Sequence, residues 1–447
     1  MLKIYNTASR KIETFKPLTD VVKIYTCGPT VYSFQHIGNY AAYVYWDLLI
    51  RALKSNGYKV KRVLNLTDVG HLVSDADEGE DKFEKTSRKE GRSVFEIAEF
   101  YADDFMQNFH LLNLVEPDVI AKATDYIAED IEAVDLMTKN GFTYETRDGV
   151  YYDTSKFDRY ADLGQLDLKG LQAGARIEFS NEKRNVSDFA VWKFIQEGEK
   201  HTMRWDYLGR PGYPGWHLEC ATIIHEELGE PIDIHTGGID HIPVHHTNEI
   251  AECFAAYGHD LSKYWMHCNF ITIDGEKISK SLGNVYLLSD LAERGFSPMD
   301  YKMWVLSGHY QGTRNFTFES LEAAKQRRLN WRNRIAECYQ KASDSDKVFE
   351  KILGAVNNNL NSAEAFAIID SSNLSLDDWQ KVDELFGLNL IKDSPKVSEE
   401  TSALILEREK VREEKNFARA DEIRAELKQQ GITVKDTTDG PIWQYLE

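Results

Sequence analysis

The sequence contains few cysteines, few prolines and no long apolar run. Its five cysteines are unevenly spaced and odd in number, which argues against a disulfide framework and for buried free thiols. Ten prolines in 447 residues, without any low-complexity segment, argue against long disordered stretches. No stretch is as long as a membrane-spanning helix, and the first residues lack the apolar core of a signal peptide. We therefore expect a cytoplasmic protein without a membrane partner.

Basic residues are also in deficit. Lys and Arg number 53 against 73 Asp and Glu, which gives a formal net charge of −20 and argues against non-specific adherence to nucleic acid. A specific nucleic-acid partner is still compatible with this charge, because binding needs only a local basic face. The hydrophobic fraction of 42% is ordinary for a globular protein, and the length suffices for two to four domains.

The segment from Val21 to Leu66 is predicted to form a strand–helix–strand unit. A β-branched run starts the first strand, which ends near Cys27, and apolar residues at helical spacing follow His36-Ile37-Gly38. The free N–H groups at the beginning of such a helix, together with the helix dipole, favour phosphate. Taken alone, a turn of this kind is common and indicates little.

A second motif makes the His36-Ile37-Gly38 turn informative. The segment Lys277-Ile278-Ser279-Lys280-Ser281 would be an ordinary exposed loop if it stood alone. Paired in this order with the His36-Ile37-Gly38 turn, it resembles the two motifs that mark class I aminoacyl-tRNA synthetases. In that family the two motifs approach ATP from opposite sides, and catalysis is mainly positioning and cationic stabilisation of charge on the phosphate oxygens.

Four positions have the chemistry of zinc ligands: Cys27, Cys220, His245 and Glu249. The last two are four residues apart, so they share one helical face. Individually, a buried thiol or a surface His/Glu pair is the commoner interpretation. Together they resemble the zinc ligands of cysteinyl-tRNA synthetases, with a Cys before the nucleotide turn, a Cys in Gly-Trp-His-Leu-Glu-Cys, and a His-His-x-x-Glu segment. His246 is an alternative to His245, which we prefer.

This resemblance implies a cysteine–tRNA ligase activity: ATP-dependent activation of L-cysteine to cysteinyl-adenylate, then transfer to tRNA(Cys). It implies one Zn²⁺ per chain and ATP with Mg²⁺ as substrate. Zinc prefers a soft thiolate, so it separates cysteine from serine and alanine, which an apolar pocket distinguishes poorly. The implied roles are catalysis by His36, Lys277 and Lys280, ATP binding by His36, Gly38, Asn39, Gly238, Asp240 and Lys280, and substrate binding by Thr67 and Trp216. Asn39 stands where the family usually has histidine.

The expected fold class is α/β. Residues 1–117 form the first half of a Rossmann-type parallel-sheet domain, 118–200 a connective insertion, and 201–317 the second half with the lysine-serine loop and a stem-contact region. Residues 318–447 form a helical bundle with a small anticodon-binding end piece. Local patterns further predict a surface loop over 69–91, a helix over 93–114 with Phe95 on its apolar side, a helix from Ala121 to about Asn140, a hairpin over 142–152, and helices over 220–228 and 245–257.

Contacts with tRNA are predicted less specifically. A basic run in the bundle, Lys325, Arg327, Arg328, Arg332 and Arg334 with Trp331 among them, is either a tRNA-facing surface or a solvated helix face. Trp443 either stacks on an unpaired anticodon base or covers the core of the end piece. We expect a monomer.

Two other functions remain open at this stage. The cysteine ligase of mycothiol biosynthesis shares the zinc and adenylation motifs, but the C-terminal segment that resembles an anticodon-binding module argues against it. A non-catalytic, zinc-stabilised tRNA-binding or regulatory paralogue is the other, and His36, Gly38 and Lys280 argue against that one.

Overall fold

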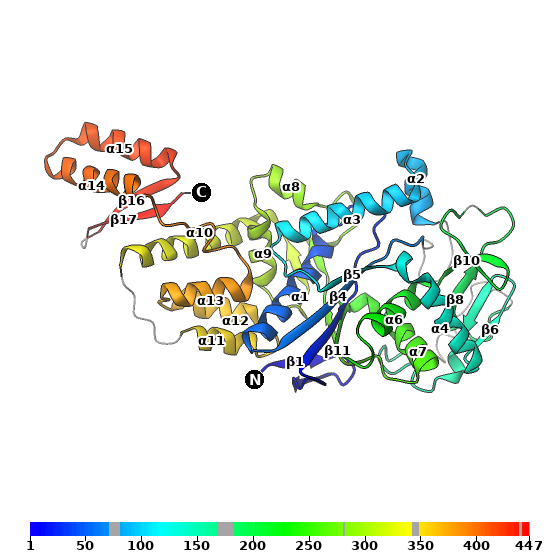
Figure 1. Ribbon diagram of the computed structural model, residues 1–447. Helices are drawn as coiled ribbons and strands as arrows, with labels where there is room; N and C mark the ends of the chain where they lie inside the picture. The colour runs from blue at the N-terminus through cyan, green and yellow to red at the C-terminus, as the bar shows by residue number, and fades with distance from the viewer. Residues whose placement is uncertain are drawn as a thin grey trace.

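The computed structural model describes residues 1–70, 81–167, 182–199, 201–279, 282–341, 348–437 and 440–446. Figure 1 shows a parallel sheet at the centre, an insertion with its own sheet at one end, and a helical region at the other. Among the described residues, no helix is both long and apolar enough to cross a membrane.

The central sheet has five parallel strands in the order β12-β11-β3-β4-β5. Their bounds are β3 Val21–Thr26, β4 Lys59–Leu66, β5 Val119–Lys122, β11 Ile232–Gly238 and β12 Ser262–Cys268. The chain leaves β3 outward through β4 and β5, and later returns on the other side of β3 through β11. Strand order therefore reverses between β3 and β11, which is where ligands bind in open parallel sheets.

Helix α1 (Ile37–Ser55) joins β3 to β4 and is buried on nearly every side. It packs against the sheet and also against α9 (Pro298–Leu306), α11 (Val348–Val356) and α13 (Leu376–Phe386). Its Asp47 is buried and accepts hydrogen bonds from Arg51 Nε and Lys302 Nζ, each at 2.8 Å. The predicted helix after the His36 turn is thus confirmed, and it is anchored to the bundle as well as to the sheet.

The insertion contains an antiparallel sheet in the order β6-β7-β8-β10-β9, packed with α4 (Ile127–Lys139). Its strands are β6 Thr143–Glu145, β7 Gly149–Tyr152, β8 Phe189–Phe194, β9 Trp205–Tyr207 and β10 Arg210–Pro214. The predicted hairpin over 142–152 is confirmed. The sheet extends past residue 200, where we expected the insertion to end, because β10 pairs with β8.

Two local predictions fail beside this insertion. The expected helix from Ala121 begins only at Ile127, because residues 119–122 form β5 and pair with β4. The central sheet therefore continues past residue 117, the expected end of its first half. Part of the loop expected over 69–91 is α2 (Lys82–Glu90), whose only buried side chain is Phe83, and which Asp81 caps. Residues 71–80 of that prediction lie outside the described part.

The remaining elements before residue 318 surround the central sheet. Figure 1 shows α3 and α2 along one edge of the molecule and α6 and α7 between the two sheets. Their bounds are α3 Val94–Leu111, α6 Trp216–Glu227, α7 His245–Tyr257, β1 Lys3–Asn6, β2 Lys11–Thr14, β13 Ile271–Ile273, β14 Glu276–Lys277, β15 Arg314–Phe316 and α8 Leu288–Glu293. Helix α7 matches its prediction, α6 begins four residues early at Trp216, and Phe95 of α3 is exposed rather than in the core.

The C-terminal region is helical, as predicted, and ends in a hairpin. It comprises α10 Phe318–Gln340, α11, α12 Ser362–Ser371, α13, α14 Glu399–Glu413, α15 Phe417–Gln429, β16 Ile432–Thr437 and β17 Gly440–Tyr445. A small core of apolar residues joins α14, α15 and the hairpin to Ala336 of α10.

The structure confirms one of the two interpretations of Trp443, the core cover. It corrects the interpretation of Arg328 and Arg334 in the basic run as part of a tRNA-facing or solvated face. Arg328 is buried and pairs with Asp300 at 3.6 Å and with Asp393, and Arg334 donates to the Ile369 carbonyl at 2.7 Å. These guanidinium groups hold the bundle together and do not form an outward basic face. Trp443 is only 5% exposed and stacks on Tyr339, so it covers the core of the end piece and is not available to a base.

Candidate functional site

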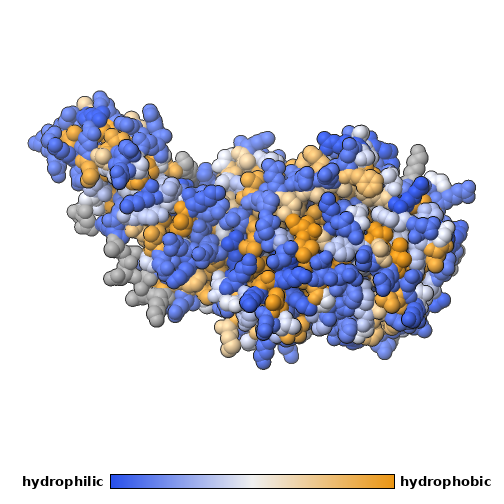
Figure 2. Space-filling view, viewed as in Figure 1, coloured by the Kyte–Doolittle hydropathy of each residue, from blue (hydrophilic) through white to orange (hydrophobic). Residues whose placement is uncertain are grey.

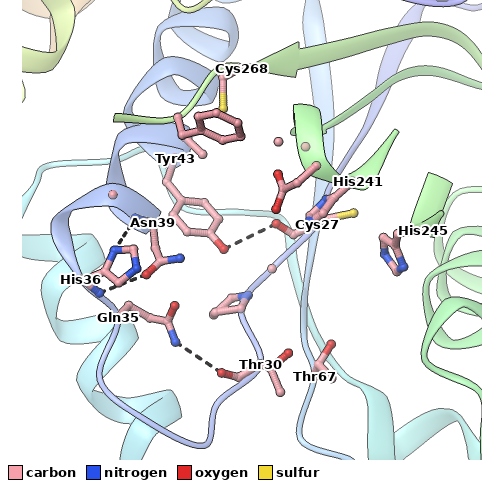
Figure 3. Close-up of a pocket in the computed structure, with 18 of the residues that line it drawn as sticks. Cys27, Thr30, Gln35, His36, Asn39, Tyr43, Thr67, His241, His245 and Cys268 are labelled. Atoms are coloured by element: carbon pink, nitrogen blue, oxygen red, sulfur yellow. Dashed lines mark hydrogen bonds between the residues drawn. The ribbon is translucent and has the colours of Figure 1, made fainter. Parts of the chain in front are cut away.

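A cavity of about 560 Å³ opens at the carboxyl ends of β3 and β11, where strand order reverses. The structure brings most of the predicted site residues to its wall: Cys27, His36, Gly38, Asn39, Thr67, Trp216, Cys220, Gly238, Asp240, His245 and Lys277. Figure 3 shows Cys27 and His245 on one side of this cavity and His36 and Asn39 on the other. Residues far apart in sequence thus share one cavity.

Two predicted residues do not line the cavity in this way. Glu249 is fully buried behind the wall, in contact with His245. Lys280 lies outside the described residues, so its predicted role stays a prediction. Lys277, on the same segment, is exposed at the cavity edge in β14.

The His36 turn is held by a reciprocal cap at the beginning of α1. The Asn39 N–H donates to His36 Nδ1 at 3.2 Å, and the His36 N–H donates to Asn39 Oδ1 at 3.1 Å. Because Nδ1 accepts a hydrogen bond, the neutral ring carries its proton on Nε2. Asn39 therefore fixes the tautomer and the angle of His36, which explains how asparagine serves at a position where the resembled family usually has histidine.

The chain just after β3 packs tightly against the end of β4, and this contact positions Thr67 at the cavity wall. The Gly28 N–H donates to Asn65 Oδ1 at 2.7 Å, and Asn65 Nδ2 donates to Thr67 Oγ1 at 3.1 Å. A Cβ on Gly28 would lie 1.6 Å from the Asn65 carbonyl oxygen, so only glycine fits there. The backbones of Val31 and Thr67 are also hydrogen-bonded.

The four predicted metal ligands come together. One ligand atom from each of Cys27, Cys220, His245 and Glu249 lies within 4.8 Å of the others, and all four residues are buried. Cys220 Sγ is 3.6 Å from His245 Nε2, and His245 Nε2 is 2.8 Å from Glu249 Oε1. Tetrahedral zinc with bonds of about 2.0–2.3 Å needs donors about 3.3–3.8 Å apart, so this set fits zinc after small adjustments.

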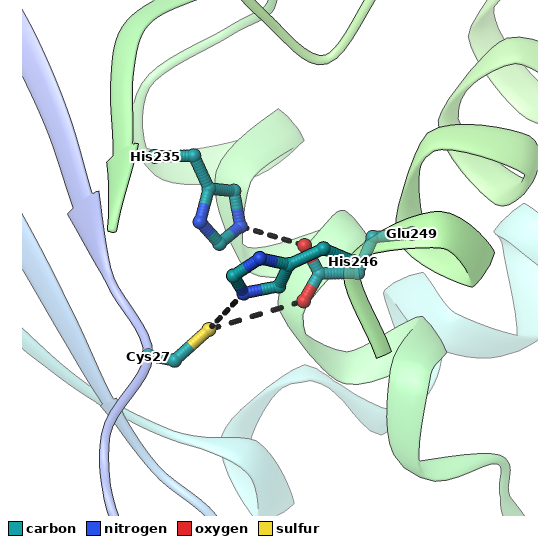
Figure 4. A group of neighbouring side chains, drawn as sticks. All are labelled: Cys27, His235, His246 and Glu249. Atoms are coloured by element: carbon teal, nitrogen blue, oxygen red, sulfur yellow. Dashed lines mark hydrogen bonds and ion pairs between the residues drawn. The ribbon is translucent and has the colours of Figure 1, made fainter. Parts of the chain in front are cut away.

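A second group overlaps the first. Cys27, His235, His246 and Glu249 also place their ligand atoms within 4.8 Å of one another, and Figure 4 shows His235 and Cys27 facing the Glu249 carboxylate. Cys27 Sγ is 3.3 Å from His246 Nε2, and His235 Nε2 is 2.6 Å from Glu249 Oε2. Of the two histidines after Val244, only His245 lines the cavity. A ligand in the cavity therefore reaches three members of the first group but only the shared Cys27 of the second.

The charges of this cluster suit a cation. Burial alone would raise the pKa of Cys27, but the hydrogen bond with Cys220 and the charge of His246 lower it well below its usual value. Burial likewise opposes ionisation of Glu249, yet His235 and His245 lower its pKa. His245 has a raised pKa despite burial, because Glu249 and Cys27 lie beside it. A thiolate and a carboxylate thus attract a positive charge to the position of the His245 ring.

Two histidines of the site, His217 and His267, were missed from the sequence. His217 Nδ1 lies 2.8 Å from His245 Nδ1, and Trp216 stacks on the His245 ring with 4.4 Å between centroids. His246 Nδ1 lies 2.7 Å from His267 Nε2, whose other nitrogen contacts Thr7 Oγ1. These histidines come from β12, α6 and α7, and no spacing in the sequence links them.

Gly237, at the end of β11, gives a prediction about packing in this cluster. A Cβ there would lie 2.6 Å from His246 Cε1 and 2.8 Å from His241 Nδ1. We expect Gly237→Ala to displace these rings, to lower the thermal midpoint of unfolding and to reduce bound zinc. The matched control is Gly354→Ala in α11, where a Cβ meets nothing within 4 Å and should stabilise the helix by about 1 kcal/mol. Calorimetry and metal analysis of both variants test this, and equal behaviour of the two would contradict it.

Comparisons with known proteins agree with this geometry. Residues 14–326 match the family described as tRNA synthetases class I (C) catalytic domain. Among solved structures, the Mycobacterium tuberculosis methionyl-tRNA synthetase in complex with methionyl-adenylate superposes with a TM-score of 0.59 over 83% of this chain and 89% of that chain, at 16% identity. That likeness shows the fold, which is the class I aminoacyl-tRNA synthetase fold, as predicted.

A second family match and two relatives identify the family within this class. Residues 394–443 match the family described as cysteinyl-tRNA ligase anticodon binding domain. The chain is 43% identical to cysteine–tRNA ligase 1 of Burkholderia lata over 98% of this chain and 96% of the relative, and 38% identical to cysteine–tRNA ligase of Treponema denticola over the whole of both. The chain belongs to the cysteine–tRNA ligase family.

Proposed function

We propose that this chain is a cysteine–tRNA ligase: with ATP it activates L-cysteine to cysteinyl-adenylate and transfers the cysteinyl group to tRNA(Cys), releasing AMP and diphosphate. One observation carries the proposal. Two thiols and an imidazole, Cys27, Cys220 and His245, line the same cavity as the capped His36 turn, with the Glu249 carboxylate buried behind them. Selection of a thiol and activation by ATP can therefore occur within one cavity. We also propose that the protein acts as a cytoplasmic monomer.

Zinc is the metal that these four residues would hold, because two thiolates, an imidazole and a carboxylate suit it better than Mg²⁺ or Ca²⁺. When bound there, zinc supplies a soft Lewis acid that favours a thiolate over a hydroxyl or a methyl group. Trp216, stacked on His245, forms the wall beside the metal site. Thr67 and Gly28 limit the other wall, so that the space suits a small amino acid.

The opposite side of the cavity would bind ATP. His36 Nε2–H, oriented by Asn39, is a donor for phosphate oxygen at the beginning of α1, where the backbone around Gly38 also allows close approach. Lys277 at the cavity edge, together with Lys280, would place positive charge on the other side of the phosphates, with Mg²⁺ accompanying the nucleotide. Gly238, the last residue of β11, and Asp240, two residues after it, would approach the adenosine and its ribose hydroxyls.

Binding of tRNA(Cys) would involve the C-terminal region that matches the anticodon-binding family. This match also favours tRNA over an aminosugar as the acceptor of the cysteinyl group. The corrected positions of Trp443 and of the arginines in α10 mean that other residues of α14, α15 and the hairpin would contact the anticodon.

The test separates the competing functions. Cysteine-dependent exchange of labelled pyrophosphate into ATP should occur without tRNA, and a tRNA(Cys) transcript should then be charged with cysteine but not serine. Exchange without charging of the transcript, combined with ligation to an aminosugar, would favour the mycothiol-type ligase. Binding of the transcript without any exchange would favour a non-catalytic paralogue. Purified protein should contain about one zinc per chain, measured by elemental analysis.

A further inference from the structure

An exposed aromatic cluster lies beside the mouth of the cavity, and the function proposed above does not yet use it. Phe34, in the loop before His36, is 43% exposed, and Phe100 of α3 is 40% exposed. Their ring centroids are 5.9 Å apart in an edge-to-face arrangement, and Tyr101 lies 5.0 Å from Phe34. Figure 2 shows hydrophobic groups at the surface where Figure 1 places α3. Such rings would normally be buried, so their exposure calls for an explanation.

The cluster is continuous with the cavity. Phe34 lines the cavity, as does the neighbouring Tyr32, whereas Phe100 extends the aromatic surface outward. Two cations accompany it: the Arg92 guanidinium lies 4.4 Å from the centroid of Phe100, and Lys82 Nζ lies 5.7 Å from that of Tyr32. Two nearby acidic groups are engaged, since Glu90 accepts from Tyr101 Oη and Glu96 caps α3, whereas Glu99 and Asp103 of α3 are exposed.

Aromatic rings interleaved with cations are the surface that binds unpaired nucleotides, whose bases stack while their phosphates meet the cations. We propose that Phe34 and Phe100, with Arg92 and Lys82, form a platform for the unpaired 3′ end of tRNA as it enters the cavity. The proposal rests on the proposed function, which requires the terminal ribose of tRNA to reach the adenylate inside the cavity. Phe34 and Lys82 of this platform line the cavity itself, so the platform adjoins the space that such a strand would enter.

Two other roles for this aromatic cluster, a purely structural one and contact with double-stranded RNA, are less consistent with the geometry. A purely structural cluster would be expected to close over its own rings. Phe100 contacts Phe34 and Tyr101 edge to face and has Arg92 over its ring, yet it remains 40% exposed. A double-stranded acceptor stem offers no accessible base faces, so stacking rings add nothing to its binding. The unpaired end is therefore the part of tRNA that suits this surface.

The test is a binding cycle with two RNA probes: a tRNA(Cys) transcript, and the same transcript without its terminal CCA. Wild-type protein should bind the complete transcript about tenfold more tightly than the shortened one, a factor typical of one stacked base. Phe100→Ala should bind the complete transcript about tenfold less tightly than wild type, and the shortened transcript as tightly as wild type does. The two changes are then non-additive, which shows that they remove the same contact.

Two further variants sharpen the result. Phe95→Ala is the matched control: Phe95 is 56% exposed on the same helix, about 140° around it from Phe100, and among the described residues it has no aromatic contact with the cluster. It should bind both transcripts like wild type. Phe100→Leu keeps apolar bulk but removes the ring, so it should lose most of the affinity for the complete transcript that Phe100→Ala loses. The test therefore still works if the alanine variant folds poorly.

The binding of the two transcripts by the Phe100 variants decides whether the platform contacts the unpaired 3′ end. Equal weakening of both transcripts, or no weakening of either, by Phe100→Ala and Phe100→Leu would overturn it. Failure of the proposed function is detected separately, because cysteine-dependent pyrophosphate exchange by wild-type protein needs no tRNA. Arg92→Gln should lower the slope of log affinity against log salt by about one for the complete transcript only.

Discussion

Replacing Cys220 with alanine is expected to empty the metal site and to abolish discrimination between cysteine and serine. Its sulfur lies 3.6 Å from His245 Nε2. Of the two donor groups found among the described residues, only the group that contains Cys220 has three members on the cavity wall. Loss of a ligand should weaken zinc binding by about a hundredfold or more, since even outer partners of ligands contribute about 10–100-fold. Elemental analysis should find far less than one zinc per chain, and cysteine-dependent pyrophosphate exchange should fall at least as steeply.

The control is Cys253→Ala on α7. Cys253 is also a buried thiol in a helix, and it lies on the same helix as His245 and Glu249, but its sulfur contacts the His259 carbonyl and no member of the donor group. This variant should keep its zinc and its specificity, although a buried thiol lost from the core lowers stability. Full zinc occupancy in Cys220→Ala would contradict the assignment. Loss of zinc in His246→Ala, with retention in Cys220→Ala, would transfer the metal to the second group.

Much of the fold follows from the sequence because periodicity and burial agree there. The β-branched run before Cys27 and the apolar stripe after Gly38 predict β3 and α1, and both form. By contrast, α2 was taken for a loop because it buries a single side chain, so its sequence has no apolar stripe. β5 was missed because its four residues are too short to show a period, and only its pairing with β4 defines it.

The site was predictable where chain neighbours suffice and unpredictable where the fold supplies the neighbour. The spacing of His245 and Glu249 is visible in the sequence, since a helix places both on one face. The contact of His217 with His245 depends on how α6 packs against α7, which no local pattern encodes. The basic run in α10 illustrates the reverse error. Its charges resemble a binding surface in sequence. In the fold, however, Arg328 pairs with the carboxylates of Asp300 and Asp393, and Arg334 donates to the Ile369 carbonyl.

Changes at His36 are expected to separate catalysis from helix capping. The ring has two functions in this structure: Nδ1 accepts from the Asn39 N–H, and Nε2 carries the proton that we assign to the ATP phosphates. Asparagine is a good N-cap residue but its side chain is too short to reach the position of Nε2. We therefore expect His36→Asn to keep wild-type stability and to lower the rate of pyrophosphate exchange by about 10²–10³-fold, as loss of one donor to a developing charge typically does.

His36→Ala completes the comparison, because it removes the cap as well as the donor. It should lose the same catalytic factor and, in addition, about 1 kcal/mol of stability, since an N-cap replaced by alanine costs about that amount. The measurements are thermal unfolding and the rate of exchange at saturating ATP and cysteine, so that a change in binding is separated from a change in rate. If His36→Asn retained the wild-type rate, the imidazole would be a cap alone, and the positive charge around the phosphates would have to come entirely from the lysine-serine segment. If instead both variants were equally destabilised, the cap would depend on the imidazole, and the loss of rate could not be assigned to Nε2.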